Sequence, residues 1–182
     1  MGDRFEALLR RDARASGSIR LTLEDALWRP AVLLAHSGDS WLWMIALVLI
    51  WLFGSPTWHQ RAALMALAVG GQALVIFAIK QLVRRERPQG EWGGIYRAID
   101  PHSFPSGHAT RATLLAVMAL GLGPPWFGVL LAVWAPLVSL ARVATGVHFI
   151  SDVAAGALIG LLMGLGMLAA QDVFIRLLPI LF

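Results

Sequence analysis

The sequence FPSGHATRATLLAVMALGLG, residues 104–123, joins a tight polar turn directly to an apolar helix. Pro105 fixes its φ angle and Gly107 tolerates almost any φ, so the backbone can turn sharply before the helix begins. The first N–H groups of that helix have no intrahelical partner and, with the helix dipole, favour an anion. Ser106 adds a hydroxyl, and His108 adds a side chain that can carry a proton near neutral pH. The turn therefore predicts a phosphate site at a helix start.

The composition of the chain indicates an integral membrane protein. Of 182 residues, 58% are hydrophobic and only 14% are charged, and the mean hydropathy is +0.68. A soluble domain of this length could not bury that much apolar surface. The basic residues cluster near the N-terminus and in 80–97, which suits anionic lipid headgroups better than nucleic acid. The chain has no cysteine, which excludes disulfides and thiolate metal sites.

Apolar runs predict an all-α, polytopic transmembrane bundle of five to six spans, because lipid cannot satisfy open backbone groups. Ala26 to His36 is too short to span, so we expect an interfacial or half-inserted helix; the alternative is a degenerate first span, which would bring the number of spans to six. Gly156, Gly160 and Gly164 recur every four residues and predict a smooth face for close helix packing. The five predicted spans are Trp41 to Phe53, about Arg61 to Lys80, Gly107 to Gly123, Trp126 to about Arg142, and His148 to Ala170, followed by an apolar piece from Val173 to Phe182.

The N-terminal residues Asp3 to Ala15 predict an amphipathic helix that lies on the membrane surface. Phe5, Leu8 and Leu9 share one face of this helix, and its arginines are expected to meet lipid phosphates. A solvated helical tail is the alternative. We therefore expect two parts, with interfacial helices in 1–38 and the transmembrane domain in 39–182.

Ionisable residues stand at the ends of the predicted spans, and they all come to one side of the membrane if successive spans alternate in direction. His148 and Asp152 are four residues apart and so share a helical face. Each cation alone could snorkel to the interface or set the topology. Two histidines, a carboxylate and several cations on one rim instead predict a functional site. The set comprises Lys80, Arg87, His108, Arg111, Arg142, His148 and Asp152.

Phosphoryl transfer is the chemistry that fits this set. Fixed cations and helix N–H groups can hold a phosphate and stabilise its oxygens as bonds change. One imidazole can attack phosphorus if a carboxylate holds its other nitrogen, and Asp152 is placed for this beside His148. A second imidazole can protonate the leaving oxygen. Carboxylates are few and cations outnumber them, so we expect neither a metal nor a cofactor.

Three motifs resemble the type 2 phosphatidic acid phosphatase superfamily, which includes lipid phosphate phosphatases, undecaprenyl-diphosphate phosphatases and phosphatidylglycerophosphate phosphatases, and shares its pocket with vanadium haloperoxidases. The resemblance covers about residues 80–152 and implies roles for individual residues. His148 would be the nucleophile, Asp152 its orienting partner and His108 the general acid. The implied phosphate-binding groups are Lys80, Arg87, Ser106, the Gly107 amide and Arg142. The motifs are Lys80-(six residues)-Arg87-Pro88, Pro105-Ser106-Gly107-His108 and Arg142-(five residues)-His148-(three residues)-Asp152.

One position departs from the family pattern, and one further cation lies outside the motifs. The family usually has Ser before the arginine of its third motif, and this chain has Ala141, while Ser139 lies on a different helix face. A lost hydroxyl contact would weaken phosphate binding by about 1 kcal/mol without abolishing the chemistry. Arg111 has no role in the motif. We expect it to reach the pocket rim or the 81–105 segment and to contact a second phosphate or a headgroup; anchoring to the interface is the alternative.

The expected function is a multi-pass hydrolase of the cell membrane that removes phosphate from a lipid phosphate or diphosphate without a metal, through a phosphohistidine. The family resemblance implies phosphatidic acid, phosphatidylglycerophosphate or undecaprenyl diphosphate as the type of substrate, and a polyprenyl-diphosphate phosphatase is the narrower alternative. A non-catalytic module that binds or transports a lipid phosphate in the same pocket is the alternative from another class, although a binder needs no nucleophile. Five spans would place the pocket on the side of the N-terminus, and six would place it opposite.

Overall fold

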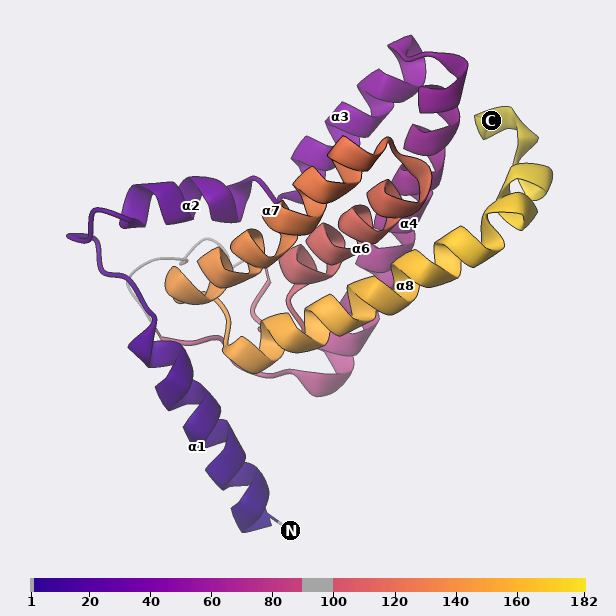
Figure 1. The fold of residues 1–182 in the computed structure, drawn as a ribbon. Helices are drawn as coiled ribbons and strands as arrows, with labels where there is room; N and C mark the ends of the chain where they lie inside the picture. The colour runs from indigo at the N-terminus through magenta and orange to yellow at the C-terminus, as the bar shows by residue number, and fades with distance from the viewer. Residues whose placement is uncertain (1, 90–99) are drawn as a thin grey trace.

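The computed structural model describes residues 2–89 and 100–182, and these residues form helices and no strand (Figure 1). The expected all-α fold is confirmed. A 3-10 turn, Pro179–Leu181, ends the described chain. The helices are α1 (Gly2–Ser18), α2 (Trp28–His36), α3 (Ser40–Phe53), α4 (Pro56–Val83), α6 (Gly107–Leu122), α7 (Pro125–Ala144) and α8 (Ile150–Leu177).

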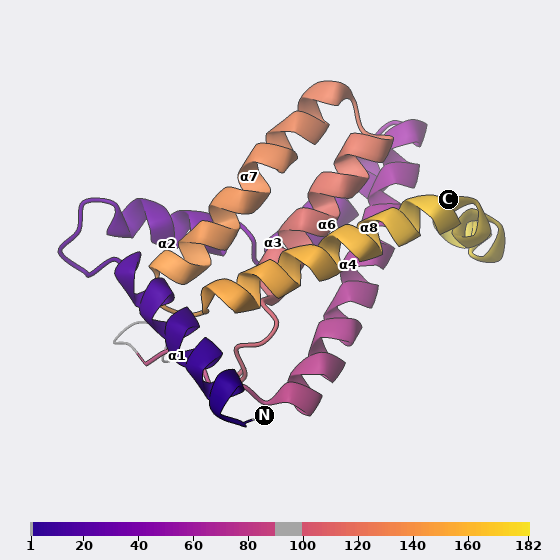
Figure 2. The ribbon, with the colours of Figure 1, turned by 60° about the horizontal axis from the view of Figure 1, so that its bottom comes forward.

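Helix α6 is the centre of the bundle. It packs most extensively against α8 and α7 and also contacts α4, and it lies among these three helices in Figure 2. Leu114, Leu115 and Met118 have no exposed surface. The turn that opens α6 is therefore held inside the protein by the helix that carries most of the core.

The spans agree in outline with the sequence, and their boundaries differ. Among the described residues, α4, α7 and α8 are each long and apolar enough to cross a membrane, and α2 with α3 could form a fourth span that is bent by 51°. Helix α6 is a further apolar helix and has 16 residues. The predicted break before Val173 is wrong, because no glycine or proline interrupts the chain there and α8 continues to Leu177.

The segment 26–36 forms a shorter helix than expected. Helix α2 has nine residues and is too short to span a bilayer by itself. Thr22 and Asp25, which resemble a helix-cap pair in the sequence, do not lie at the start of this helix. The Asp25 carboxylate accepts hydrogen bonds from the Thr22 backbone N (2.6 Å) and hydroxyl (2.9 Å), so the pair closes a turn three residues before Trp28.

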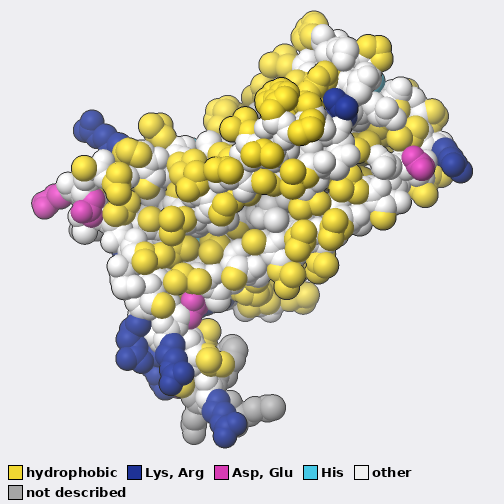
Figure 3. Space-filling model, viewed as in Figure 1, with side chains coloured by type: hydrophobic (Ala, Val, Ile, Leu, Met, Phe, Trp, Pro, Cys, Tyr) yellow, Lys and Arg dark blue, Asp and Glu magenta, His cyan; other side chains and the backbone are white. Residues whose placement is uncertain are grey.

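Helix α1 stands at the end of the bundle where α7 connects to α8 (Figure 1). Arg4, Arg10, Arg11 and Arg14 are exposed on it, and Figure 3 shows the basic side chains gathered there while apolar side chains cover the bundle. Leu8 is 61% exposed, so this apolar residue does not pack into the protein. An amphipathic N-terminal helix is confirmed, and its place on a membrane surface remains a prediction.

The glycine stripe of α8 packs closely against α6, as the sequence predicts. A Cβ atom at Gly160 would lie 2.2 Å from the carbonyl oxygen of Thr110, and one at Gly156 would lie 2.6 Å from that of Ser106. Non-bonded carbon–oxygen contacts are essentially never so short. The glycines therefore allow the backbones of α8 and α6 to lie closer together than residues with side chains would permit. The contact between Gly156 and Ser106 lies at the turn that opens α6.

Replacement of Gly160 by alanine should therefore destabilise the protein, because the new methyl group would push α8 away from α6. We expect a loss of about 1–3 kcal/mol, seen as a fall of about 5 °C in Tm in detergent. Gly166→Ala is the matched control, since a Cβ there meets nothing within 4 Å. An equal Tm for the two variants would contradict the packing described above.

Candidate active site

A cavity of about 270 Å³ lies between α4, α6 and the connections that follow α4 and α7. It brings together most of the residues that the sequence singled out. Ser106 and Asp152 lie behind this lining, and neither has any exposed surface. The predicted residues that line the cavity are Lys80, Arg87, Gly107, His108, Arg111, Arg142 and His148.

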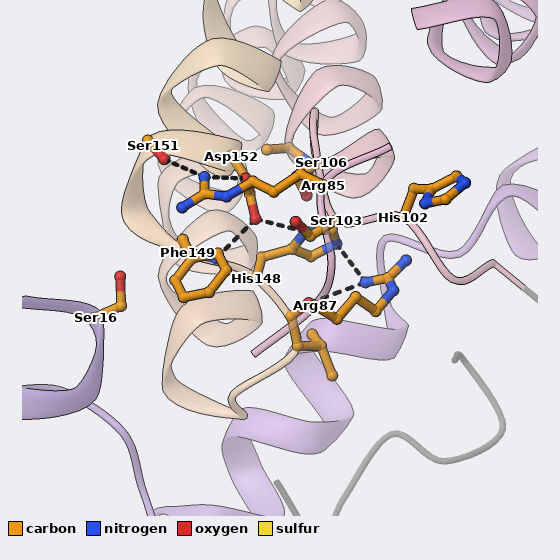
Figure 4. Close-up of polar contacts among 12 residues, drawn as sticks. Ser16, Arg85, Arg87, His102, Ser103, Ser106, His148, Phe149, Ser151 and Asp152 are labelled. Atoms are coloured by element: carbon orange, nitrogen blue, oxygen red, sulfur yellow. Dashed lines mark hydrogen bonds and ion pairs between the residues drawn. The ribbon is translucent and has the colours of Figure 1, made fainter. Parts of the chain in front are cut away.

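His148 sits in the connection between α7 and α8, and its two ring nitrogens face different partners (Figure 4). Nε2 lies 3.2 Å from the NH1 of Arg87, a donor, so Nε2 holds a lone pair on this side. Nδ1 lies 3.5 Å from Oδ2 of Asp152, one helical turn further along the chain. Burial lowers the pKa of His148 to about 3; the contact with Asp152 opposes this shift, and the charges of Arg142 and Arg87 add to it. The imidazole is therefore neutral at physiological pH.

Two of the predicted phosphate-binding cations meet a carboxylate that the sequence analysis did not single out. Arg87 donates from NH2 to Oδ2 of Asp100 (2.8 Å) and from Nε to its backbone carbonyl (2.7 Å). Lys80 donates from Nζ to the same carboxylate oxygen. Asp100 thus places one negative charge where the two cations converge. Arg142, at the C-terminal end of α7, is only 1% exposed and lines the same cavity.

His108 lies on the first turn of α6 and contacts the connection between α2 and α3. Its Nε2 is 2.6 Å from Oδ1 of Asp39, whose second oxygen lies 3.0 Å from Nδ1 of His36. A Cβ atom at Gly38 would lie 3.2 Å from the His108 ring, so the glycine allows the ring to approach. Asp39 fixes the orientation of His108, and the sequence contains no motif that indicates this pair.

Arg111 is 5% exposed, so its side chain lies inside the protein and does not extend from the surface. Its Nε (2.8 Å) and NH2 (2.5 Å) both donate to the carbonyl oxygen of Gly38. It also lines the cavity, as expected of a rim residue. Its described partner lies between α2 and α3 rather than in the 81–105 segment. Contact with a second phosphate or a headgroup remains a prediction.

The turn at Ser106 is tied to both helices that flank it. The Ser106 hydroxyl oxygen accepts a hydrogen bond from the backbone N of Ala109 (3.4 Å) and so caps α6, which leaves its O–H free to donate elsewhere. The Ser106 backbone N donates to the carbonyl oxygen of Asp152 (3.0 Å). The hydroxyl of Ser139 donates to the Ala135 carbonyl (3.0 Å) in its own helix, so it does not replace the serine that Ala141 lacks.

Three other side chains near the site were not found by sequence reasoning. Arg85 donates from NH1 to Oδ1 of Asp152 (2.7 Å) and from NH2 to Oδ2 of Asp12 (2.7 Å). Ser16 accepts a hydrogen bond from the backbone N of Ile150 (2.9 Å). The run of arginines at 84, 85 and 87 is visible in the sequence, but only Arg87 fits a motif. Within residues 2–89 and 100–182, no three His, Asp or Glu side chains gather as ligands for a metal ion.

A helical bundle with apolar spans, and with a cavity in which cations surround a neutral imidazole, fits a membrane phosphatase. Comparisons with known protein families and relatives agree with this class of protein. Residues 61–176 match the PAP2 superfamily. Decaprenylphosphoryl-5-phosphoribose phosphatase of Mycobacterium tuberculosis is 34% identical over 170 residues, which cover 85% of this chain and 89% of that protein. The chain belongs to the PAP2 superfamily, and the resemblance seen in its motifs is confirmed.

Solved structures show the same fold. The crystal structure of a transmembrane PAP2-type phosphatidylglycerolphosphate phosphatase from Bacillus subtilis has a TM-score of 0.75 and 27% identity, over 91% of this chain and 87% of that chain. Aquifex aeolicus LpxE has a TM-score of 0.70 and 23% identity, over 86% of this chain and 93% of that chain. The protein is an integral-membrane phosphatase.

The pairing of Asp100 with Lys80 and Arg87 predicts a competition with the substrate phosphate. Asp100→Asn should lower the KM for a phosphorylated lipid by about fivefold, because the incoming phosphate would no longer displace a carboxylate from the two cations. Phosphate release at a series of substrate concentrations measures this. A rise in KM would show instead that Asp100 orients the cations.

Proposed function

We propose that this protein hydrolyses a phosphorylated lipid through a phosphohistidine formed on His148. One observation supports this above the others. A buried, neutral imidazole lines the cavity, with Nε2 beside Arg87 (3.2 Å) and Nδ1 facing the carboxylate of Asp152 (3.5 Å). A nucleophile needs such a lone pair and such an orienting carboxylate, whereas a protein that only binds phosphate needs neither.

The proposed reaction has two steps. Nε2 of His148 attacks phosphorus and forms the N–P bond as the P–O bond to the lipid breaks. His108 gives its proton to the leaving oxygen, and Asp152 stabilises the charge that develops on the His148 ring. In the second step water attacks phosphorus, His108 takes a proton from that water, and the N–P bond breaks to release phosphate.

The proposed role of the cations is to stabilise the phosphoryl oxygens in both steps. Lys80, Arg87 and Arg142 would hold these oxygens, together with the Ser106 hydroxyl and the Gly107 backbone N–H at the start of α6. These contacts can strengthen in the transition state without a proton transfer. The groups that make them stay in fixed positions during both steps. The proposed mechanism requires no metal ion.

We propose a lipid as the leaving group because the cavity adjoins the outer face of the bundle. Phe77 on α4 lines the cavity and is 64% exposed, so it borders both the site and the surface that faces lipid. The Mycobacterium tuberculosis relative is named for a decaprenyl-linked phosphate, which favours a polyprenyl-linked phosphate as the substrate. Phosphatidylglycerolphosphate, in the name of the Bacillus subtilis structure, is the second candidate.

Phosphate release from four lipids would test the substrate proposal. These are phosphatidic acid, phosphatidylglycerophosphate, undecaprenyl phosphate and undecaprenyl diphosphate. Higher kcat/KM on the two prenyl lipids supports the polyprenyl proposal, and a preference for either glycerolipid contradicts it.

We further propose that the enzyme resides in the cell membrane, with residues 1–38 at the interface and 39–182 forming the catalytic domain.

His148→Ala should abolish turnover, because no other side chain in the described cavity faces both Arg87 and a buried carboxylate. We expect a fall of at least about 10³-fold in kcat, with the Tm kept, since the ring lies in a connection and not in the core of the bundle. Phosphate release and thermal unfolding measure the two quantities. Wild-type turnover in this variant would refute the nucleophile.

The role of His108 predicts a dependence on the leaving group. His108→Gln should lower kcat on a phosphorylated lipid by about 10²–10⁴-fold. It should have little effect on the first-turnover release of nitrophenol from a nitrophenyl phosphate ester, whose leaving group departs without a proton before His108 is needed as a base. Asp39→Asn should show the same selectivity with a smaller loss, because Asp39 orients the His108 ring. Equal losses in the first-turnover rate on both substrates would contradict the assignment of His108 as general acid.

A further inference from the structure

Helix α1 is joined to the first turn of α8 by two side chains, Asp12 and Ser16. Oδ1 of Asp12 accepts a hydrogen bond from the backbone N of Ser151 (3.1 Å), and the hydroxyl oxygen of Ser16 accepts one from the backbone N of Ile150 (2.9 Å). The first N–H groups of a helix have no partner within it. Asp12 and Ser16 lie four residues apart on one face of α1. They therefore cap α8 from a distant part of the chain.

Arg85 lies between the carboxylates of Asp12 and Asp152. Its NH2 donates to Asp12 (2.7 Å), and its NH1 donates to Asp152 (2.7 Å) and to the hydroxyl of Ser151 (2.6 Å), as Figure 4 shows for the last two contacts. The guanidinium also stacks over the ring of Phe149, 4.0 Å from its centroid. The planar guanidinium fixes all these directions together, which a lysine could not do.

The contact with Arg85 determines how Asp152 faces His148. Arg85 holds Oδ1 of Asp152, and the backbone N of Phe149 donates to Oδ2 (2.9 Å). Both oxygens are therefore fixed, and Oδ2 is the one that faces Nδ1 of His148 at 3.5 Å. Asp152 has no exposed surface, so without Arg85 its buried charge would lose the cation that contacts Oδ1, and the Phe149 N–H alone would hold the carboxylate through Oδ2.

We propose that Arg85 is a positioning residue for Asp152 and that helix α1, through Asp12, holds Arg85 in place. The inference rests on the proposed function, since it requires that Asp152 orients His148. Helix α1 lies outside residues 61–176, which match the family, whereas the proposed catalytic and phosphate-binding residues all lie within them. The N-terminal helix of this chain thus sets the rate of a reaction to which it contributes no reacting group.

The test compares variants of the purified full-length chain, with phosphatidic acid and undecaprenyl diphosphate as probes. Asp12→Asn and Arg85→Lys should each lower kcat by about 10-fold or more and leave KM within about twofold, because Lys80, Arg87 and Arg142 are untouched. Arg85→Lys keeps the charge and removes the planar donor geometry. The loss in kcat with an unchanged KM is the result that a purely structural contact would not give.

Two further variants on α1 serve as controls. Glu6→Gln is the matched loss of a carboxylate, since Glu6 pairs with the exposed Arg10 on the same helix, and it should leave kcat unchanged. Ser16→Ala removes one cap of α8 without touching Arg85, so it should lower the Tm and keep kcat. If Ser16→Ala slows the reaction as much as Asp12→Asn, then α1 acts through its docking alone and the proposed route through Arg85 is wrong.

A double-mutant cycle tests the route directly. Asp12→Asn should lower kcat in the wild-type background and have almost no further effect in an Arg85→Gln background. Additive losses, or a wild-type kcat in Asp12→Asn, would overturn the inference while His148→Ala stays inactive. An active His148→Ala variant, or a wild-type protein that hydrolyses no lipid phosphate, would instead overturn the proposed function, so the two failures are distinguishable.

Discussion

The rest of the site depends on how the buried carboxylate of Asp152 is paired. A charge without exposed surface is costly unless it is paired and hydrogen-bonded. Arg85 and the backbone N of Phe149 meet this requirement, and they fix the oxygen that faces His148. The same residue accepts a hydrogen bond from Ser106 through its backbone carbonyl. One residue on α8 thereby fixes the distance between the imidazole and the turn that opens α6.

The close packing of α8 on α6 makes this arrangement possible. Gly156 and Gly160 allow the two backbones to approach, and Gly156 lies against the carbonyl of Ser106 itself. A larger residue at either position would separate α8 from the turn and lengthen the bond between Ser106 and Asp152. The small residues that look purely structural in the sequence therefore control the geometry of the candidate site, because the helix that carries Asp152 is positioned by them.

The sequence predicted the parts of the site that follow from motif spacing and from the cost of burying charge. Lys80, Arg87, His108, Arg142 and His148 do line one cavity, since each lies at or near the end of a helix and successive helices of the bundle alternate in direction. Asp12, Asp39, Asp100 and Arg85 could not be predicted in this way. Their partners are distant in sequence or lie in irregular segments, and a single acidic residue in a polar stretch indicates no partner.

Boundaries were the least predictable feature of the fold. Helix α8 continues past Ala170 because Gln171 and Asp172 are ordinary helix residues, although their polarity suggested a break. The contact of α1 with Ser151 could not be predicted either, since the amphipathic pattern of α1 indicates a lipid surface.

Trapping of the phosphorylated enzyme during turnover would show whether His148 forms a bond to phosphorus. The wild-type enzyme would be mixed with a lipid labelled with ³²P at its terminal phosphate, quenched in alkali within milliseconds, digested and mapped by mass spectrometry. We expect an alkali-stable, acid-labile phosphoryl group on the peptide that contains His148. Label on another residue, or turnover without labelled protein at any time point, would contradict it.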